Sequence, residues 1–411
     1  MAKAWMPPDP NKASLFSDRD PHRHAVQRRK FSSLYSMSSL VGYEPFVNNC
    51  TSMLTARFTE LALAGQTINF QHWLQCYAFD VIGEITFANR FGFLDVGEDK
   101  EGVFKAIDQR GQYSTFIGVF PWLHQFLFPR LPTTGGHAFV YNYTLKQISD
   151  REKLLKDPKN PGREGPPDIM TKILLAHEEN PSKITKLDLI TMCQSNIGAG
   201  SDTTAITLSS ILYHLLKYPQ TYRTLQDEID TAAKKGKISD PVTFKETQDH
   251  LPYLNAVIKE ALRIHPATGL PMARLVPPTG ATISNTFIPG GSTVGINAWV
   301  AHRNASIFGS DAAIFRPERW LEKEEEEEEE EAGEKRIEME KYMLPFGMGS
   351  RTCIGKNISL LEMSKLIPQL VRRFDFSLDE REDLRCENRW FVKQMNFRGK
   401  VVLRDGGRLE T

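Results

Sequence analysis

The longest periodic run of apolar residues covers residues 185–217 and predicts one central helix. Thr185, followed three residues later by Asp188, is typical of a capping box at a helix start, and Pro219 ends the pattern. Another helix is predicted to begin at Pro21. Shorter helical patterns, most of them bounded by proline or glycine, cover residues 71–86, 221–235, 250–265 and 356–374.

The predicted β-structure is smaller and lies in the C-terminal half of the chain. Between residues 273 and 301, short β-branched runs are separated by Pro-Gly and Gly-Gly pairs, and residues 376–403 have the pattern of a hairpin. Prolines break the aromatic stretch 113–131 into short helices and a loop, while residues 156–167 predict a linker. Strands and helices do not alternate regularly, so the pattern argues against a doubly wound sheet and favours a mainly α fold with a smaller β part.

Charge and cysteine content exclude several classes of protein. The 51 basic and 51 acidic residues give a net charge of zero and no electrostatic reason for nucleic-acid binding. Five cysteines without a C-x-x-C pair argue against a disulfide framework or a structural zinc site, and fit a reducing compartment. No apolar window approaches a membrane span or the core of a signal peptide, which predicts a soluble or peripheral protein. The glutamate run 324–331 predicts a disordered acidic surface insertion.

Cys353 lies in the glycine-rich stretch F-G-M-G-S-R-T-C-I-G of residues 346–355, directly before a predicted helix. Gly347, Gly349 and Gly355 permit backbone conformations and close approaches that a β-carbon would prevent. Backbone donors and the dipole at the helix start are expected to lower the pKa of the thiol. A thiolate is a metal ligand, so the surroundings favour a bound metal over the alternative of an inert core cysteine.

The pattern F-x-x-G-x-R-x-C-x-G within this stretch resembles the haem-binding loop of the cytochrome P450 family at every defining position. The resemblance implies that Cys353 is the proximal ligand of the haem iron and that Arg351 pairs with a haem propionate, with Phe346 and Gly347 in the same cofactor-binding loop. It covers about residues 13 to 405. It implies the P450 fold, a helical bundle around haem with small antiparallel or mixed sheets, in one monooxygenase domain of residues 1–411.

Residues 198–204, G-A-G-S-D-T-T, place two glycines inside the central helix, at a cost of about 1 kcal/mol each relative to alanine. Glycine lets a flat group approach the backbone, a threonine hydroxyl can bond the preceding turn, and a carboxylate beside a hydroxyl can relay protons. The alternative is a packing groove for a neighbouring helix. The segment resembles the family motif [A/G]-G-x-[D/E]-T-[T/S]. The resemblance implies that Asp202 and Thr203 deliver protons to bound oxygen and that Ala199 and Gly200 face the haem and oxygen pocket.

Two further motifs resemble those of the family and follow in its order. Glu260-Ala-Leu-Arg263 matches the E-x-x-R helix, and Phe315-Arg-Pro-Glu-Arg-Trp320 resembles the P-E-R-F segment, with tryptophan in place of the commoner phenylalanine. The resemblance implies a buried charge triad of Glu260, Arg263 and Arg319 that braces the haem-side loop. Removing one partner is expected to strand a buried charge. A second E-x-x-R, at residues 382–385, is interpreted as accidental.

Three more cationic side chains match positions that bind haem propionates in the family. His24 and Arg28 share one helical face by their i,i+4 spacing and resemble its H-x-x-x-R. Arg274 matches the arginine at the start of the strand after the E-x-x-R helix. A solvated surface position is the alternative for each of them. His265 and His302 are expected to be surface or loop histidines without a role.

The resemblance implies an enzyme that contains haem b and inserts one atom of O2 into a small lipophilic substrate, by hydroxylation or O-demethylation. Electrons are expected from NADPH through cytochrome P450 reductase, with cytochrome b5 as a further donor, to a monomeric protein. The runs P-A-T-G-L-P-M-A-R and N-A-W-V-A-H-R-N are most similar to fungal secondary-metabolite members, such as the pisatin demethylase group.

Two alternatives remain open at the level of sequence. A haem–thiolate isomerase or dehydratase would need no external electrons, although the intact Asp202–Thr203 pair argues against it. Eukaryotic family members typically begin with an anchor in the endoplasmic reticulum membrane and with strands and helices that cover the substrate site. This chain begins almost at the H-x-x-x-R helix, so we expect an N-terminally incomplete sequence. A truncated, non-catalytic haem-binding remnant is therefore the second alternative.

Overall fold

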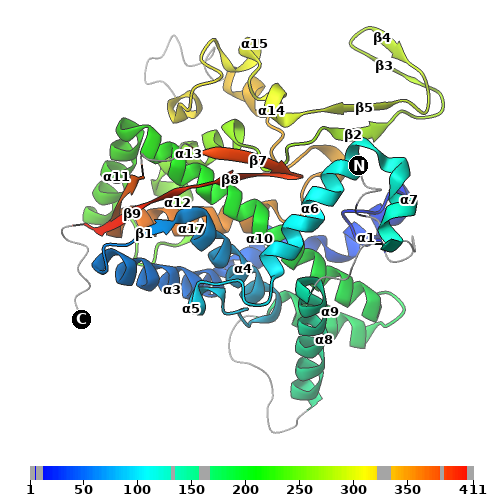
Figure 1. Ribbon diagram of the computed structural model, residues 1–411, viewed down its shortest axis with the longest axis horizontal. Helices are drawn as coiled ribbons and strands as arrows, with labels where there is room; N and C mark the ends of the chain where they lie inside the picture. The colour runs from blue at the N-terminus through cyan, green and yellow to red at the C-terminus, as the bar shows by residue number, and fades with distance from the viewer. Residues whose placement is uncertain are drawn as a thin grey trace.

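The central helix of the fold is α10 (Lys186–Lys217), around which the other long helices pack in the computed structural model (Figure 1). The structure describes Trp5 and residues 13–130, 135–156, 167–321, 335–379 and 384–404. The predicted capping box is confirmed: the Thr185 hydroxyl accepts from the Asp188 N–H at 3.1 Å, and the Asp188 carboxylate accepts from the Thr185 N–H at 2.9 Å. Pro219 follows the C-cap and opens the next helix.

The core lies between α10 and three other long helices, which are α3 (Glu44–Leu63), α4 (Phe70–Phe87) and α17 (Lys356–Arg373). Almost every side chain of α4 is buried, because this helix runs against α10 on one side and against α3 on another. A β-carbon on Gly200 of α10 would lie 2.9 Å from Cγ1 of Ile82 on α4. The two backbones therefore approach more closely than a larger residue at position 200 would allow.

The remaining helices surround this core. They are α1 (Pro21–Phe31), α2 (Met37–Val41), α5 (Phe93–Val96), α6 (Val103–Val119), α7 (His124–Leu127), α8 (Gly135–Lys156), α9 (Ile169–Glu179), α11 (Pro219–Lys234), α12 (Phe244–His250), α13 (Pro252–Ile264), α14 (Ala298–Ala301) and α15 (Ala305–Phe308). Short 3-10 turns connect several of them, among them Pro317–Trp320 and Gly349–Arg351.

All strand pairs in the described residues are antiparallel. The largest sheet has the order β1-β9-β6, from β1 (Thr67–Asn69), β9 (Arg398–Leu403) and β6 (Phe374–Leu378). Three two-stranded sheets pair β2 (Met272–Leu275) with β5 (Thr293–Ile296), β3 (Ala281–Ile283) with β4 (Thr286–Ile288), and β7 (Arg385–Arg389) with β8 (Phe391–Met395). The β3–β4 hairpin extends away from the helical part of the molecule (Figure 1). The predicted mainly α fold with small sheets is confirmed.

Several element predictions need correction. The helix predicted at residues 250–265 is α13, which begins two residues later, at Pro252, while the short helix α12 before it was not predicted. α6 continues without a break to Val119, so only the part after it consists of short helical turns. The long helices α3 and α8 were not predicted. The glutamate run 324–331 and most of the 156–167 linker lie outside the described residues. Among the described helices, none is long and apolar enough to cross a membrane.

Candidate active site around Cys353

The Cys353 loop joins a 3-10 turn to the start of α17. Gly347 and Gly349 have φ angles of 71° and 68°, in the left-handed region that side chains strain, so both glycines are needed as predicted. Gly355 has a φ of −84°, and a β-carbon there would lie 4.0 Å from the Cys353 Sγ, an ordinary contact. Gly355 therefore does not use the left-handed conformation and makes no tight contact with the described protein atoms, whereas the close approach of a bound group at this position stays a prediction. The Cys353 N–H donates to the Phe346 carbonyl at 2.8 Å and closes the loop.

The Cys353 thiol is open on one side and enclosed by protein on the others. Its residue is exposed, in contrast to Cys50, Cys76 and Cys193, which are buried as ordinary core cysteines are. Burial nevertheless raises the pKa of the Cys353 thiol, and the N–H groups of Gly355 and Lys356 and the charge of Arg28 offset this only in part. The predicted lowering of the pKa is wrong for the thiol by itself. A bound metal would displace the proton, because thiolates rather than thiols bind metals.

Four cationic side chains from three elements lie around this loop. The Arg28 Nη1 on α1 donates to the Thr352 carbonyl at 2.7 Å, and the Arg351 Nη1 donates to the Asp18 carbonyl at 2.6 Å. Burial lowers the pKa of Arg351, and the nearby charges of Arg274 and Arg28 lower it further. Burial also lowers the pKa of His24, again with Arg351 and Arg28 adding to the effect.

This cationic cluster carries a surplus of positive charge. Within the described part of the chain, no carboxylate forms an ion pair with Arg28, Arg274 or Arg351. His24 is 4 % exposed, so the solvated-surface alternative is wrong for this residue, whereas Arg274 on β2 is exposed. Asp18 lies close enough to raise the pKa of Arg351, but its carboxylate pairs with Arg23, so the three arginines leave an excess of positive charge that favours an anionic ligand with two or more acceptor groups. Together with an open thiol, the donor set fits an iron centre that carries carboxylates.

The predicted residues in the G-A-G-S-D-T-T segment of α10 face different parts of the molecule. Ala199 is exposed although it lies in the middle of the longest helix, and the Thr203 hydroxyl donates to the Ala199 carbonyl at 2.7 Å, the back-bond to the preceding turn that was expected. Gly200 faces Ile82, so the packing-groove alternative accounts for this glycine. Asp202 is 2 % exposed and directed away from Ala199 toward α4 and β8.

Asp202 has partners that were not predicted from the sequence. Its Oδ1 accepts from the Gln75 Nε2 at 2.6 Å, and its Oδ2 lies 2.8 Å from the Lys393 Nζ. Gln75 is 127 positions and Lys393 is 191 positions away along the chain, so no local pattern joins them to Asp202. Only the packing of α4 and β8 against α10 brings these residues together.

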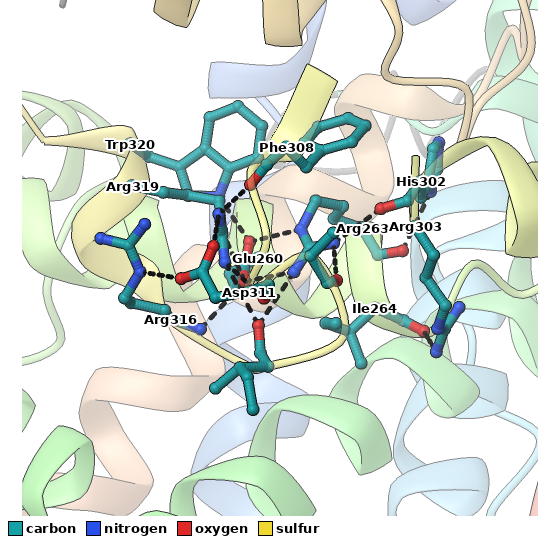
Figure 2. A network of polar contacts seen from close by, with 12 residues as sticks. Glu260, Arg263, Ile264, His302, Arg303, Phe308, Asp311, Arg316, Arg319 and Trp320 are labelled. Atoms are coloured by element: carbon teal, nitrogen blue, oxygen red, sulfur yellow. Dashed lines mark hydrogen bonds and ion pairs between the residues drawn. The ribbon is translucent and has the colours of Figure 1, made fainter. Parts of the chain in front are cut away.

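Glu260, Arg263 and Arg319 meet in a buried network (Figure 2). The Glu260 carboxylate accepts two N–H bonds from Arg263, at 2.8 and 2.7 Å, and one from Arg319 at 3.0 Å. The Trp320 indole N–H donates to the same carboxylate at 2.8 Å. A phenylalanine, common at this position in the resembling motif, could not make that bond, so the tryptophan adds a donor to the network.

His302 connects this network to the Cys353 loop. Its Nδ1 lies 2.9 Å from the Arg263 carbonyl and its Nε2 accepts from the Leu344 N–H at 2.8 Å, two residues before Phe346. The geometry therefore assigns the proton to Nδ1. Both His302 and His265 are buried, at 0 and 5 % exposure, so the prediction of surface or loop histidines is wrong. Burial lowers the pKa of each to about 4.

An exposed cysteine in a glycine-rich loop, beside a cluster of arginines, fits a haem–thiolate protein. A family model described as "Cytochrome P450" matches residues 3–398, and the chain belongs to this family. Cytochrome P450 monooxygenase cicH of Emericella nidulans is 40% identical over 401 residues, which are 95% of this chain and 77% of that protein. Pisatin demethylase of Fusarium vanettenii is 39% identical over 390 residues, 93% of this chain and 73% of the demethylase. The family makes this chain a haem-iron oxidoreductase of the monooxygenase type.

Proposed function

We propose that this protein inserts one oxygen atom of O2 into a small lipophilic substrate, by hydroxylation or O-demethylation, with electrons passed from NADPH through cytochrome P450 reductase. The observation that carries the proposal is the open Cys353 thiol beside three arginines that have no carboxylate partner among the described residues. The family relationship supports haem as the group that completes this site.

In this proposal Cys353 holds the haem iron, and Arg28, Arg274 and Arg351 with His24 hold the haem propionates. When bound, the haem supplies O2 activation, which thiolate ligation favours by directing electron density toward O–O cleavage. Phe346 and Gly347 shape the loop against the haem. Ala199 borders the oxygen side, where Thr203 can hold a proton at its hydroxyl, while Gly200 lets α10 pack closely against α4. Asp202 is the acid that exchanges protons with the surroundings.

The relatives support the substrate class and the reaction type. One relative is named for demethylation of pisatin, and others are named cytochrome P450 monooxygenases of fungi. We extend this to the chain as oxidation of a small lipophilic secondary metabolite. A membrane reductase as the electron donor would place the working enzyme at the endoplasmic reticulum, with cytochrome b5 as a second donor, and the residues 1–411 would act as one monomeric catalytic domain.

The test is haem binding and its dependence on one sulfur. The haem-loaded protein should give the red-shifted Soret band of a thiolate-ligated carbon monoxide complex when reduced. Cys353→Ala should abolish this band, whereas Cys386→Ala, which removes the other exposed cysteine, should leave it unchanged. A Cys353→Ala protein that retains the band would refute the ligand assignment.

Turnover then separates the remaining classes. NADPH-dependent product formation with a reductase, using pisatin as the first probe, would support the monooxygenase. Product formed without O2 and without a reductase would support the isomerase or dehydratase instead. A wild-type chain that folds and binds haem but forms no product under either condition would support the non-catalytic haem-binding remnant.

A further inference from the structure

The Asp202 carboxylate is held by a lysine that it shares with another acid. Lys393 lies on β8, is 4 % exposed, and places its Nζ 2.8 Å from the Asp202 Oδ2. The same ammonium also bonds the carboxylate of Asp108, which lies on α6. One cation therefore bridges two carboxylates from two helices that are far apart in the sequence.

Among the described residues, the Lys393 bridge continues into further ion pairs. Asp108 also forms an ion pair with Arg389 of β7 at 2.8 Å, and Arg389 pairs with Glu387 at 2.6 Å. Burial by itself would lower the pKa of Lys393, but the carboxylates of Asp202 and Asp108 outweigh it and hold that pKa above its ordinary value. Lys393 is therefore a permanent cation at neutral pH, and its two acids compete for it.

The β7–β8 hairpin is hydrogen-bonded to α10, and α6 packs against its strand β7. The Gln394 Nε2 donates to the Ile206 carbonyl of α10 at 3.0 Å, directly after Lys393 in the chain. On α6, a β-carbon at Gly111 would lie 2.3 Å from the Arg389 carbonyl, so the helix backbone rests directly on β7. Asp108 lies one turn before Gly111 on the same helix. Any shift of α6 off the hairpin thus withdraws Asp108 from Lys393.

We propose that Lys393 is a counter-ion shared by Asp202 and Asp108, and that the position of α6 against the β7–β8 hairpin sets how tightly Lys393 holds the Asp202 carboxylate. With α6 seated, Asp108 takes part of the hydrogen bonding and charge of Lys393, so Lys393 holds Asp202 less tightly than it would alone, beside the bond that Gln75 donates to the same carboxylate. With α6 displaced, Lys393 pairs with Asp202 alone and holds it as a fixed anion. The inference rests on the proposed role of Asp202 in proton exchange, and it makes Lys393 and Asp108 positioning residues.

The first test asks whether Asp108 fixes α6, by hydrogen–deuterium exchange of the haem-loaded protein. Asp108→Asn should raise amide exchange in α6 by about tenfold, the change that losing a charge-assisted bond makes in a local opening equilibrium. Asp230→Asn is the matched control, because Asp230 is also partly exposed and pairs with an arginine, Arg404, at 2.7 Å. Equal exchange of α6 in Asp108→Asn and Asp230→Asn would overturn the proposal.

The second test reads the Asp202 carboxyl directly, by infrared spectroscopy as a function of pH. Lys393→Met should produce a protonated-carboxyl band at neutral pH that disappears in the Lys393→Met, Asp202→Asn double variant. Lys393→Arg should resemble the wild type. In Asp108→Asn the Asp202 band should emerge only at a lower pH than in the wild type, since Lys393 then serves Asp202 alone. A shift to higher pH, or none, would overturn the proposal, and this variant retains the lysine should Lys393→Met fail to fold.

These measurements are independent of the proposed function. Failure of the wild-type protein to give the thiolate-type carbon monoxide spectrum would refute the haem assignment, while the exchange and infrared results would still report on the Lys393 bridge. Conversely, a normal spectrum in Asp108→Asn with unchanged α6 exchange would refute the bridge alone.

Discussion

Replacing Glu260 by glutamine tests how the buried charge network holds the fold together (Figure 2). Glu260 is fully buried and accepts five N–H bonds, from the side chains of Arg263, Arg319 and Trp320 and from the backbone of Arg316. Glutamine keeps the shape but removes the charge and replaces one acceptor oxygen by an amide that can only donate. That amide would face N–H donors whichever way it turned.

Arg263, which donates two of these five bonds, cannot replace them by other contacts. Arg263 also donates to the carbonyls of His302, Ala312 and Ile314, so all five of its N–H groups are already used. Two charge-assisted bonds to the changed oxygen would be lost, at roughly 1.5–3 kcal/mol each. The expected loss is about 3–5 kcal/mol, the range for removing one partner of a buried ion pair. A typical protein has only about 5–15 kcal/mol of stability in total.

The assay is urea unfolding of the haem-loaded protein, with the free energy obtained by linear extrapolation. Arg316→Met is the matched control, because the Arg316–Asp311 pair is substantially exposed and such pairs contribute only about 0–1 kcal/mol. Haem content should also fall in Glu260→Gln, since His302 links Arg263 to the Cys353 loop. If Glu260→Gln and Arg316→Met lose the same free energy, the argument that the buried network needs this charge is wrong.

Three further predictions use the same unfolding assay. Trp320→Phe should lower the unfolding free energy by about 1.5–3 kcal/mol, because it removes an N–H bond to a buried charge, and an unchanged value would contradict the role of the tryptophan. His265 and His302 are held neutral with pKa values of about 4, so the unfolded state binds more protons between pH 6.5 and 4. Stability should fall over that window by about 3 kcal/mol for each, and His302→Gln should flatten the slope measured from pH 7 to 4. Burial raises the pKa of Glu362 well above its ordinary value and its carboxyl has no hydrogen-bond partner among the described residues, so wild-type stability should fall as pH rises above about 4.5. Glu362→Gln should gain relative to the wild type from pH 5 to 8, and a Gln variant that loses stability there would show an ionised carboxylate instead.

Prediction from sequence was most accurate for features that neighbouring residues bring about. The capping box at Thr185 and Asp188, the left-handed glycines of the Cys353 loop and the change to strands after residue 272 depend on neighbours within a few positions. α3 was missed although its buried residues Val47, Cys50, Leu54 and Phe58 recur at helical spacing. α13 was predicted to within two residues of its bounds because Pro252 and Pro266 mark its two ends.

The candidate site residues could be named one by one from the sequence, but the contacts between them and the rest of the protein could not. Cys353 and Arg351 could be located because the spacing of their motif is specific, whereas the E-x-x-R motif of Glu260 was chosen from two copies by its order in the chain. The lowered thiol pKa was not realised, because burial of the loop outweighs two backbone donors. Lys393, Gln75 and Asp108 gave no signal, since a lone lysine, glutamine or aspartate in an amphipathic segment is ordinarily a solvated residue.

The sequence by itself determined several of the long helices, α10 among them, the backbone of the Cys353 loop and the residue types proposed to bind haem, because these depend on local conformation and on side-chain chemistry. Only the tertiary structure decided how the charges are paired. It brought three arginines and His24 from α1, β2 and the Cys353 loop close together, and it turned Asp202 toward Lys393 and away from Ala199. The physical reason is that an ion pair or a hydrogen bond needs atoms within about 3–4 Å, and residues more than a hundred positions apart reach that distance only when whole helices and strands have packed.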